Sequence, residues 1–383
     1  MEKIAVTPPR VFFYVQHLLG VGHLVRANRI AEALLEAGFE VTMAMGGLPV
    51  AGFPGPGIKL AALPPVKAAS AGFSGLEDSE GDPVDDDFKA RRCQRLLAAL
   101  SECRPHAVII EAFPFGRRAM RFELLPLLAA AHAMKEKPLV VSSVRDILQE
   151  NSKPGRAEET VAIVGKSFDL VMVHGDPRFA AFDDTFPLAA AIAGKIAYTG
   201  LVAGPPPPPA AETFDIVISA GGGAAGLDLV KAAALMARRL APRRRCCLLT
   251  GPNLPHSEFE TLSALNVPGL EVFKFRNDLP SLLCGTQLSV SQAGYNTVCD
   301  ILRAGCRSLL VPFAKGGETE QTARAMRLRS MALAGILPED GLTASTLTMA
   351  VEAALAGPPP GRNPFDLEGA RHSATLLRRR ISG

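Results

Sequence analysis

Two glycine-containing segments of the chain carry residues that could bind a phosphorylated ligand. The first is a loop of six residues between a strand-like apolar run and a helical pattern, with glycine at Gly221, Gly222, Gly223 and Gly226. The second turns at Gly294 and opens a helix that contains Asn296, Thr297 and, one turn later, Asp300. Backbone N–H groups at a helix start bind anions, and a nearby carboxylate accepts hydrogen bonds from sugar hydroxyls. The pattern predicts a site for a sugar nucleotide, and the alternative is a pair of ordinary strand–turn–helix junctions.

A third glycine-containing segment, Gly20-Val21-Gly22-His23, follows the first strand-like run. A dinucleotide-binding fingerprint would need a glycine where Val25 stands, so the segment disfavours an NAD site. At a helix start the dipole disfavours the cationic form of His23, which suits a neutral general base. The alternative is a histidine that only caps a loop.

Other polar residues follow predicted strands or begin helices. Glu320 and Gln321 open a helix after a polar loop, and a carboxylate with an amide can bind several sugar hydroxyls. Glu111, Arg117, Arg145 and Asp146 lie where N-terminal strands should end. We interpret them as acceptor-side residues, with Asp146 as the second candidate base after His23, and the alternative is a salt-bridged loop.

The elements that position these residues alternate between strand and helix throughout the chain. This alternation predicts an α/β protein with two doubly wound, Rossmann-like parallel-sheet domains that face each other across a cleft. The proline run Pro205–Pro209 marks the boundary. We expect an N-terminal domain at 1–203, a linker at 204–213, a C-terminal domain at 214–363, and a final helix at 364–383 that returns to the first domain.

Composition narrows the class of protein further. The chain has 383 residues, of which 48% are hydrophobic, and a net charge of +3 is too small to indicate nucleic-acid binding. Seven cysteines without a C-x-x-C pair predict free thiols and no structural metal. We expect a cytoplasmic protein with no membrane span, and attachment to the inner face of a membrane stays open.

The second half resembles the GT-B glycosyltransferases of family 28, the MurG-like family. The matching pieces are the Gly221–Gly226 loop, the Ala-Gly-x-x-Thr core before Asp300, Val311-Pro312-Phe313, and Glu320-Gln321. In the first half the resemblance rests chiefly on residues 20–23. The other N-terminal segments look closer to bacterial relatives described only as predicted glycosyltransferases.

The resemblance implies roles for individual residues. The Gly221–Gly226 backbone, Asn296 and Thr297 would hold a diphosphate, and Asp300 would bind the ribose in place of the usual Glu. Backbone near Phe275 and Arg276 would contact uracil. Glu320, where MurG carries Gln, would bind the donor sugar with Gln321. His23 matches the histidine beside the acceptor, near Gly20 and Gly22.

The predicted function is an inverting, metal-independent transfer of a hexose or N-acetylhexosamine from a UDP-sugar to an acceptor hydroxyl. The UDP-sugar is a donor substrate, no cofactor is expected, and the expected acceptors are lipid-linked or cell-envelope polysaccharides. Two alternatives remain open. One is a UDP-GlcNAc 2-epimerase-like enzyme, which needs no acceptor, and the other is a catalytically silent UDP-sugar-binding subunit.

Overall fold

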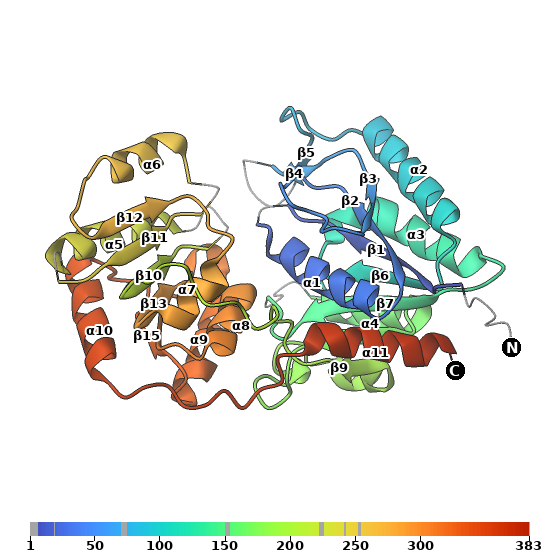
Figure 1. The fold of residues 1–383 in the computed structure, drawn as a ribbon. Helices are drawn as coiled ribbons and strands as arrows, with labels where there is room; N and C mark the ends of the chain where they lie inside the picture. Colours follow the sequence, from blue (N-terminus) through green and yellow to red (C-terminus); the bar gives the residue numbers. More distant parts are fainter. Residues whose placement is uncertain are drawn as a thin grey trace, which may run out of the picture. The chain divides into compact units, whose positions relative to one another are not determined.

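The computed structural model describes residues 7–18, 20–69, 75–149, 154–221, 226–240, 243–251 and 254–382. The chain divides into two compact units (Figure 1). The first unit comprises Met1–Val202 and Glu368–Gly383, and the second comprises Ala203–Leu367. Residues 204–210, which contain the proline run, form neither helix nor strand.

The first unit is built on a seven-stranded sheet in the order β3-β2-β1-β6-β7-β8-β9, in which every pairing is parallel. Its central strands are apolar and almost fully buried, as expected for a sheet covered on both faces. The bounds are β1 (Arg10–Val15), β2 (Glu40–Met45), β3 (Lys59–Ala62), β6 (Ala107–Glu111), β7 (Leu139–Arg145), β8 (Leu170–His174) and β9 (Ile196–Tyr198). A separate antiparallel pair consists of β4 (Lys67–Ala68) and β5 (Leu76–Glu77).

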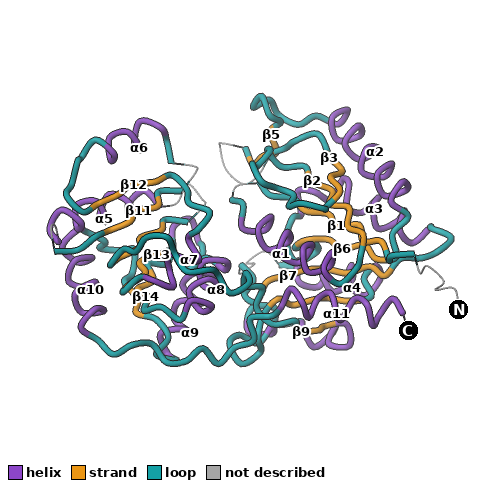
Figure 2. The backbone as a smooth tube through the Cα atoms, viewed as in Figure 1, coloured by secondary structure: helices purple, strands orange, loops and turns teal. Residues whose placement is uncertain are grey.

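Helices cover this sheet (Figure 2). They are α1 (Gly22–Glu36), α2 (Asp86–Cys103), α3 (Arg121–Ala133), α4 (Arg156–Ser167) and α11 (Gly369–Ser382), with short 3-10 turns at Arg118–Met120, Phe182–Asp184 and Ala189–Lys195. The C-terminal α11 packs along α1, and α2 packs along α3. Arg378 of α11 donates to the Ala37 carbonyl and lies 4.7 Å from the centre of the Phe39 ring.

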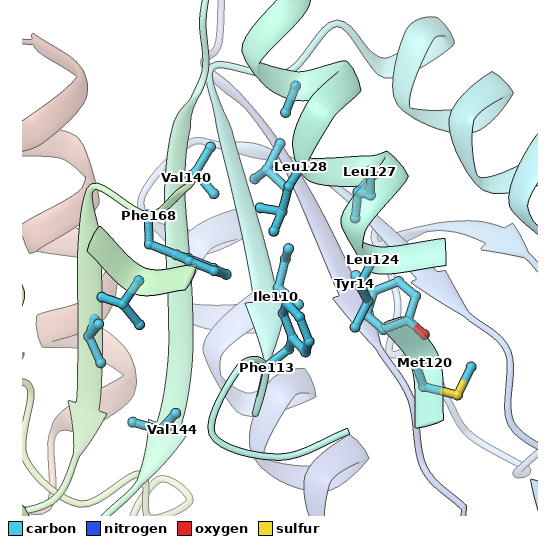
Figure 3. Packing of buried hydrophobic residues seen from close by; sticks show 14 of the residues in the cluster. Tyr14, Ile110, Phe113, Met120, Leu124, Leu127, Leu128, Val140, Val144 and Phe168 are labelled. Carbon is cyan, nitrogen blue, oxygen red and sulfur yellow. The ribbon is translucent and has the colours of Figure 1, made fainter. Parts of the chain in front are cut away.

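The core of the first unit lies between the sheet and α3 (Figure 3). Leucines 124, 127 and 128 of α3 pack over Ile110 of β6 and Val140 of β7. Beside them, the buried Tyr14 hydroxyl donates to Glu123 at 2.5 Å, and Arg92 Nε donates to the same carboxylate at 2.7 Å. These buried charges are hydrogen-bonded, as burial of ions requires.

The second unit contains a six-stranded, all-parallel sheet in the order β12-β11-β10-β13-β14-β15. Its strands are β10 (Ile216–Ser219), β11 (Cys246–Leu249), β12 (Leu270–Phe273), β13 (Leu288–Ser291), β14 (Ser308–Leu310) and β15 (Gly335–Ile336). Its helices are α5 (Leu227–Leu240), α6 (His256–Ser263), α7 (Leu279–Gly285), α8 (Tyr295–Ala304), α9 (Glu320–Ser330) and α10 (Ala344–Ala356), with a 3-10 turn at Lys315–Gly317.

Both sheets reverse their winding direction once. In the first, the order runs outward from β1 to β2 and β3, and from β6 to β7, β8 and β9 on the other side. In the second, the corresponding reversal lies between β10 and β13. In doubly wound folds, ligands bind outside the carboxyl ends of the strands at such a switch point. The predicted class, two Rossmann-like parallel-sheet domains, is confirmed.

Candidate functional site

The switch point of the first sheet brings His23 and Glu111 together. His23 lies in the first turn of α1, directly after β1, and Glu111 is the last residue of β6. His23 Nδ1 lies 3.0 Å from Glu111 Oε1. The Glu111 side chain is fully buried, whereas 19% of the His23 side chain is exposed. The two residues are 88 positions apart, so no local sequence pattern indicates that they pair.

Arg26, one turn after His23 on α1, completes a buried charge pair. Its guanidinium donates to Glu111 Oε1, and the same Nη2 lies 3.3 Å from His23 Nδ1. Although burial raises it, Arg26 and the hydrogen bond with His23 hold the pKa of Glu111 well below its usual range. An ionised carboxylate can only accept hydrogen bonds. His23 Nδ1 is therefore the protonated nitrogen, and Nε2 carries the lone pair.

The surroundings keep His23 neutral. Burial, followed by the positive charge of Arg117, lowers the pKa of His23 to about 3 against the opposing effect of Glu111. Burial and the like charge of Arg145 also lower the pKa of Arg117, to about 10. A neutral imidazole with a lone pair on Nε2 is the form that acts as a general base.

Beside Glu111 in the sheet lies a row of buried polar residues that no sequence motif indicated. Ser143 Oγ of β7 donates to Glu111 Oε2 at 2.6 Å and lies 2.9 Å from His174 Nε2 of β8. His174 Nδ1 lies 2.8 Å from Thr199 Oγ1. The available signal was weak: a serine within an apolar strand and a histidine at the end of another are common in proteins.

The other residues that we predicted on the acceptor side differ in their burial and contacts. Asp146 is fully buried and accepts from the Ile147 N–H at 2.8 Å, so its carboxylate has no exposed surface for an acceptor. Arg117 is held by its Nε, which donates to the Gln16 carbonyl at 2.8 Å. Arg145 ends β7 and is half-buried, Gly22 begins α1, and Gly20 has open space where a side chain would start.

The switch point of the second sheet is built from closely packed backbone. Gly222 and Gly223 lie outside the described residues, and Gly221 and Gly226 flank that gap. A Cβ on Gly226 would lie 2.4 Å from that of Ala220, and one on Gly251 would lie 2.3 Å from the Gly221 carbonyl. The loops after β10 and β11 therefore approach more closely than side chains at these positions would allow.

The helix α8 starts beside this loop, directly after β13. Gly294 is its N-cap and, as a glycine, has no side chain with which to cap the first-turn N–H groups. Asn296, Thr297 and Asp300 are all half-buried and lie on one face, since they are three and four residues apart. This face presents backbone donors, a hydroxyl and a carboxylate together.

Glu320 and Gln321 have structural contacts of their own. Glu320 is buried and pairs with the fully buried Arg324 at 2.7 Å. The Gln321 Oε1 atom accepts from the N–H groups of Ala293 and Phe313, at 3.0 and 3.2 Å. Gln321 thereby ties the loop before α8 to the loop after β14, and its amide nitrogen is the group left to face a ligand.

Phe275 and Arg276 follow β12 and differ sharply in exposure. Phe275 is 71% exposed, an unusual value for an aromatic side chain. Arg276 donates to both carboxylate oxygens of Asp278, at 2.8 and 2.7 Å, and also pairs with Glu212. The Arg276 side chain is thus held by contacts within the protein. The local backbone and the Phe275 ring are the groups that remain to contact a nucleobase.

In the part of the chain that the structure describes, no group of three His, Cys, Asp or Glu side chains could hold a metal ion. No helix of the described residues has the length and apolar character needed to cross a bilayer.

The sequence of the second unit is similar to that of known glycosyltransferases. Residues 216–362 match the model of the glycosyltransferase family 28 C-terminal domain. Relatives named UDP-N-acetylglucosamine–N-acetylmuramyl-(pentapeptide) pyrophosphoryl-undecaprenol N-acetylglucosamine transferase are 35% identical over 86 residues in Rhodospirillum centenum and 29% over 109 residues in Alkaliphilus oremlandii. These matches cover 22% and 28% of this chain, and 23% and 30% of the relatives.

Solved structures match the whole chain in fold. The calicheamicin glycosyltransferase CalG4 is 16% identical with a TM-score of 0.60, covering 98% of this chain and 94% of its own. MurG of Acinetobacter baumannii is 16% identical with a TM-score of 0.58, covering 97% and 100%.

The chain has the GT-B fold. Its residues 216–362 match the glycosyltransferase family 28 C-terminal domain, and the predicted resemblance to the MurG-like family is confirmed.

Proposed function

We propose that the protein is an inverting, metal-independent glycosyltransferase that uses no cofactor and moves a hexose or N-acetylhexosamine from a UDP-sugar to an acceptor hydroxyl. The observation that carries the proposal is the neutral His23, whose Nδ1 is held by Glu111 at the switch point of the first sheet. The family of the second unit supports a nucleotide-sugar donor.

In this proposal His23 acts as the general base. Its Nε2 accepts the proton of the acceptor hydroxyl while that oxygen forms a bond to the anomeric carbon. The bond from this carbon to the UDP oxygen breaks on the opposite face, so the configuration inverts. Glu111 stabilises the imidazolium that forms, as a carboxylate does for a catalytic histidine in other enzymes.

The second unit binds the donor and stabilises the leaving group. The N-terminus of α8, which has Gly294 as its N-cap, and the Gly221–Gly226 loop provide N–H donors for the diphosphate, where charge develops as UDP departs. Asp300 accepts from the ribose hydroxyls, and the exposed Phe275 ring stacks on uracil. The Gln321 amide nitrogen, and Glu320 after release from Arg324, contact the donor sugar.

The acceptor belongs to the lipid-linked or cell-envelope class in this proposal. The names of the relatives support it, because they specify an undecaprenol-linked acceptor and an N-acetylglucosamine donor. An acceptor of this kind places the protein at the cytoplasmic face of the membrane as a peripheral protein.

UDP release tests the proposal. The purified chain is incubated with UDP-glucose, UDP-galactose, UDP-N-acetylglucosamine or UDP-N-acetylgalactosamine, with and without a short-chain polyprenyl-linked saccharide acceptor, with chelator present. Acceptor-dependent UDP release that His23→Ala abolishes is the expected result. Conversion of UDP-N-acetylglucosamine without acceptor would indicate an epimerase, and UDP binding without turnover would indicate a binding subunit.

A further inference from the structure

Four buried side chains of the first unit form a hydrogen-bonded row behind His23. From the β9 edge of the sheet toward its centre they are Thr199, His174, Ser143 and Glu111, and all are at most 3% exposed. They come from four neighbouring segments of the sheet: the last residue of β6, a residue near the end of β7, the last residue of β8 and the residue after β9. Each lies within 2.9 Å of the next through side-chain atoms.

The direction of each hydrogen bond follows from the chemistry of the row. Glu111 is ionised and accepts, so the single hydroxyl hydrogen of Ser143 is directed at Glu111 Oε2. The Ser143 oxygen must then accept from His174 Nε2, which carries the hydrogen. His174 is neutral, because burial and the nearby Arg26 lower its pKa to about 3. Its Nδ1 therefore accepts from the Thr199 hydroxyl.

Every bond in the row thus donates toward Glu111. The row holds Oε2 of this carboxylate, which leaves Oε1 to face His23 Nδ1 and Arg26. Without it the carboxylate could turn toward Arg26, and Nδ1 of His23 could instead accept from Arg26 at 3.3 Å. That change would place the hydrogen on His23 Nε2 and remove the lone pair.

We propose that His174 is a positioning residue which, through Ser143, orients Glu111 and so fixes the tautomer of His23 with its lone pair on Nε2. The row reaches further, since the Thr199 carbonyl lies 3.1 Å from His372 Nδ1 of the C-terminal α11. The tautomer is a property of the folded chain alone. Only its catalytic consequence rests on the proposed function.

Nuclear magnetic resonance of the histidine ring nitrogens tests the proposed tautomers directly. In protein labelled with ¹⁵N-histidine, the shifts of the two ring nitrogens distinguish Nδ1–H from Nε2–H, and single histidine variants assign the signals. The expected result at pH 7 is Nδ1–H for His23 and Nε2–H for His174 in the unaltered chain. His23 as Nε2–H would overturn the proposal.

Variants of His174 and Ser143 test whether these residues control the tautomer of His23. His174→Phe and Ser143→Ala should each give mixed tautomers at His23, whereas His174→Gln, which keeps an N–H near the Nε2 position, should retain Nδ1–H. His132→Phe is the matched control, because His132 is a half-buried histidine of the same unit bonded only to the Ser167 carbonyl. An unchanged His23 tautomer in a folded Ser143→Ala protein would overturn the coupling.

Kinetics separate this proposal from the proposed function. His174→Phe and Ser143→Ala should lower kcat about 10- to 100-fold, as misplacement of a catalytic group does, with KM for the UDP-sugar unchanged. His174→Gln should recover most of the loss. If the tautomers behave as expected but the unaltered chain transfers no sugar, the positioning role stands and the transferase function fails.

Discussion

The two units share one sheet topology but differ in the chemical groups that line their switch points. The first places a histidine, a carboxylate and an arginine at the reversal between β1 and β6, all tied to buried neighbours. The second places glycines, including the N-cap of a helix, at the reversal between β10 and β13. One switch point is made of side chains and the other largely of backbone.

This difference matches the two tasks in the proposed reaction. Proton transfer needs a side chain with a set protonation state, and burial with a fixed partner provides it. A diphosphate needs several N–H donors in a small space, and glycine allows the backbone to approach. The comparison predicts that variants of the first switch point change turnover, whereas variants of the second change donor binding.

The largest expected effect is that of His23→Ala. It should lower kcat about 100- to 10,000-fold, because a general base contributes that much, and leave the Kd for UDP unchanged. Acceptor-dependent UDP release and calorimetric binding measure the two quantities. His256→Ala is the control, since this exposed histidine lies on α6 of the second unit. Weaker UDP binding by His23→Ala would break the division of tasks.

Glu111→Gln should cost about 3 kcal/mol of unfolding free energy, because it leaves the buried Arg26 without a carboxylate. Chemical denaturation monitored by circular dichroism gives this value. Glu159→Gln is the matched control in the same unit. Its 41% exposed carboxylate pairs with Arg118 and Arg121, and its loss should cost below about 1 kcal/mol. Equal losses for both variants would mean that the Glu111 pair is no more than a surface contact.

Asp300→Ala tests the second switch point. Loss of charge-assisted hydrogen bonds to the ribose should weaken UDP binding about 10- to 100-fold, with the fold unchanged. Glu352→Ala on the exposed face of α10 should leave the Kd unaltered. Isothermal titration with UDP decides the matter, and equal affinities for Asp300→Ala and the unaltered chain would remove the ribose role.

The pH dependence of stability should arise in the first unit. His23 and His174 have folded pKa values of about 3, below the unfolded value near 6.5, so the unfolded chain binds protons first as the pH falls. Stability should be constant above pH 6.5 and decrease below it by up to ~1.4 kcal/mol per pH unit for each histidine. Denaturation at pH 7.5, 6.5 and 5.5 measures the slope. His174→Gln should remove the contribution of His174, and an unchanged slope would contradict this assignment.

The sequence predicted the second switch point better than the first for a physical reason. A glycine loop or a helix start is a local pattern, so Gly294 and Asp300 were recognisable within a few residues. The environment of His23 depends on Glu111, Ser143 and His174, which only the sheet brings together. The spacing of residues along the chain carries no information about contacts between distant strands.

The elements of the fold also differ in how clearly the sequence indicates them. Strands with continuous apolar runs, such as β1 and β8, can be recognised from the sequence because burial on both faces leaves a clear signal. The strands β3 and β15, of four and two residues, carry no such signal. The strand β3 lies at a sheet edge and has exposed residues, so its sequence lacks the apolar run that marks its neighbours.

The path of the chain at the end of the first unit also determines how the protein can be divided. Val202, where the chain leaves this unit, pairs with Glu368, where it returns. The residues between them are therefore an insertion whose two ends meet at one antiparallel bridge. A truncation after residue 202 would strip α11 from α1. Joining residues 202 and 368 by a few glycines should instead preserve the first unit as a minimal protein and release residues 203–367 as a separate one.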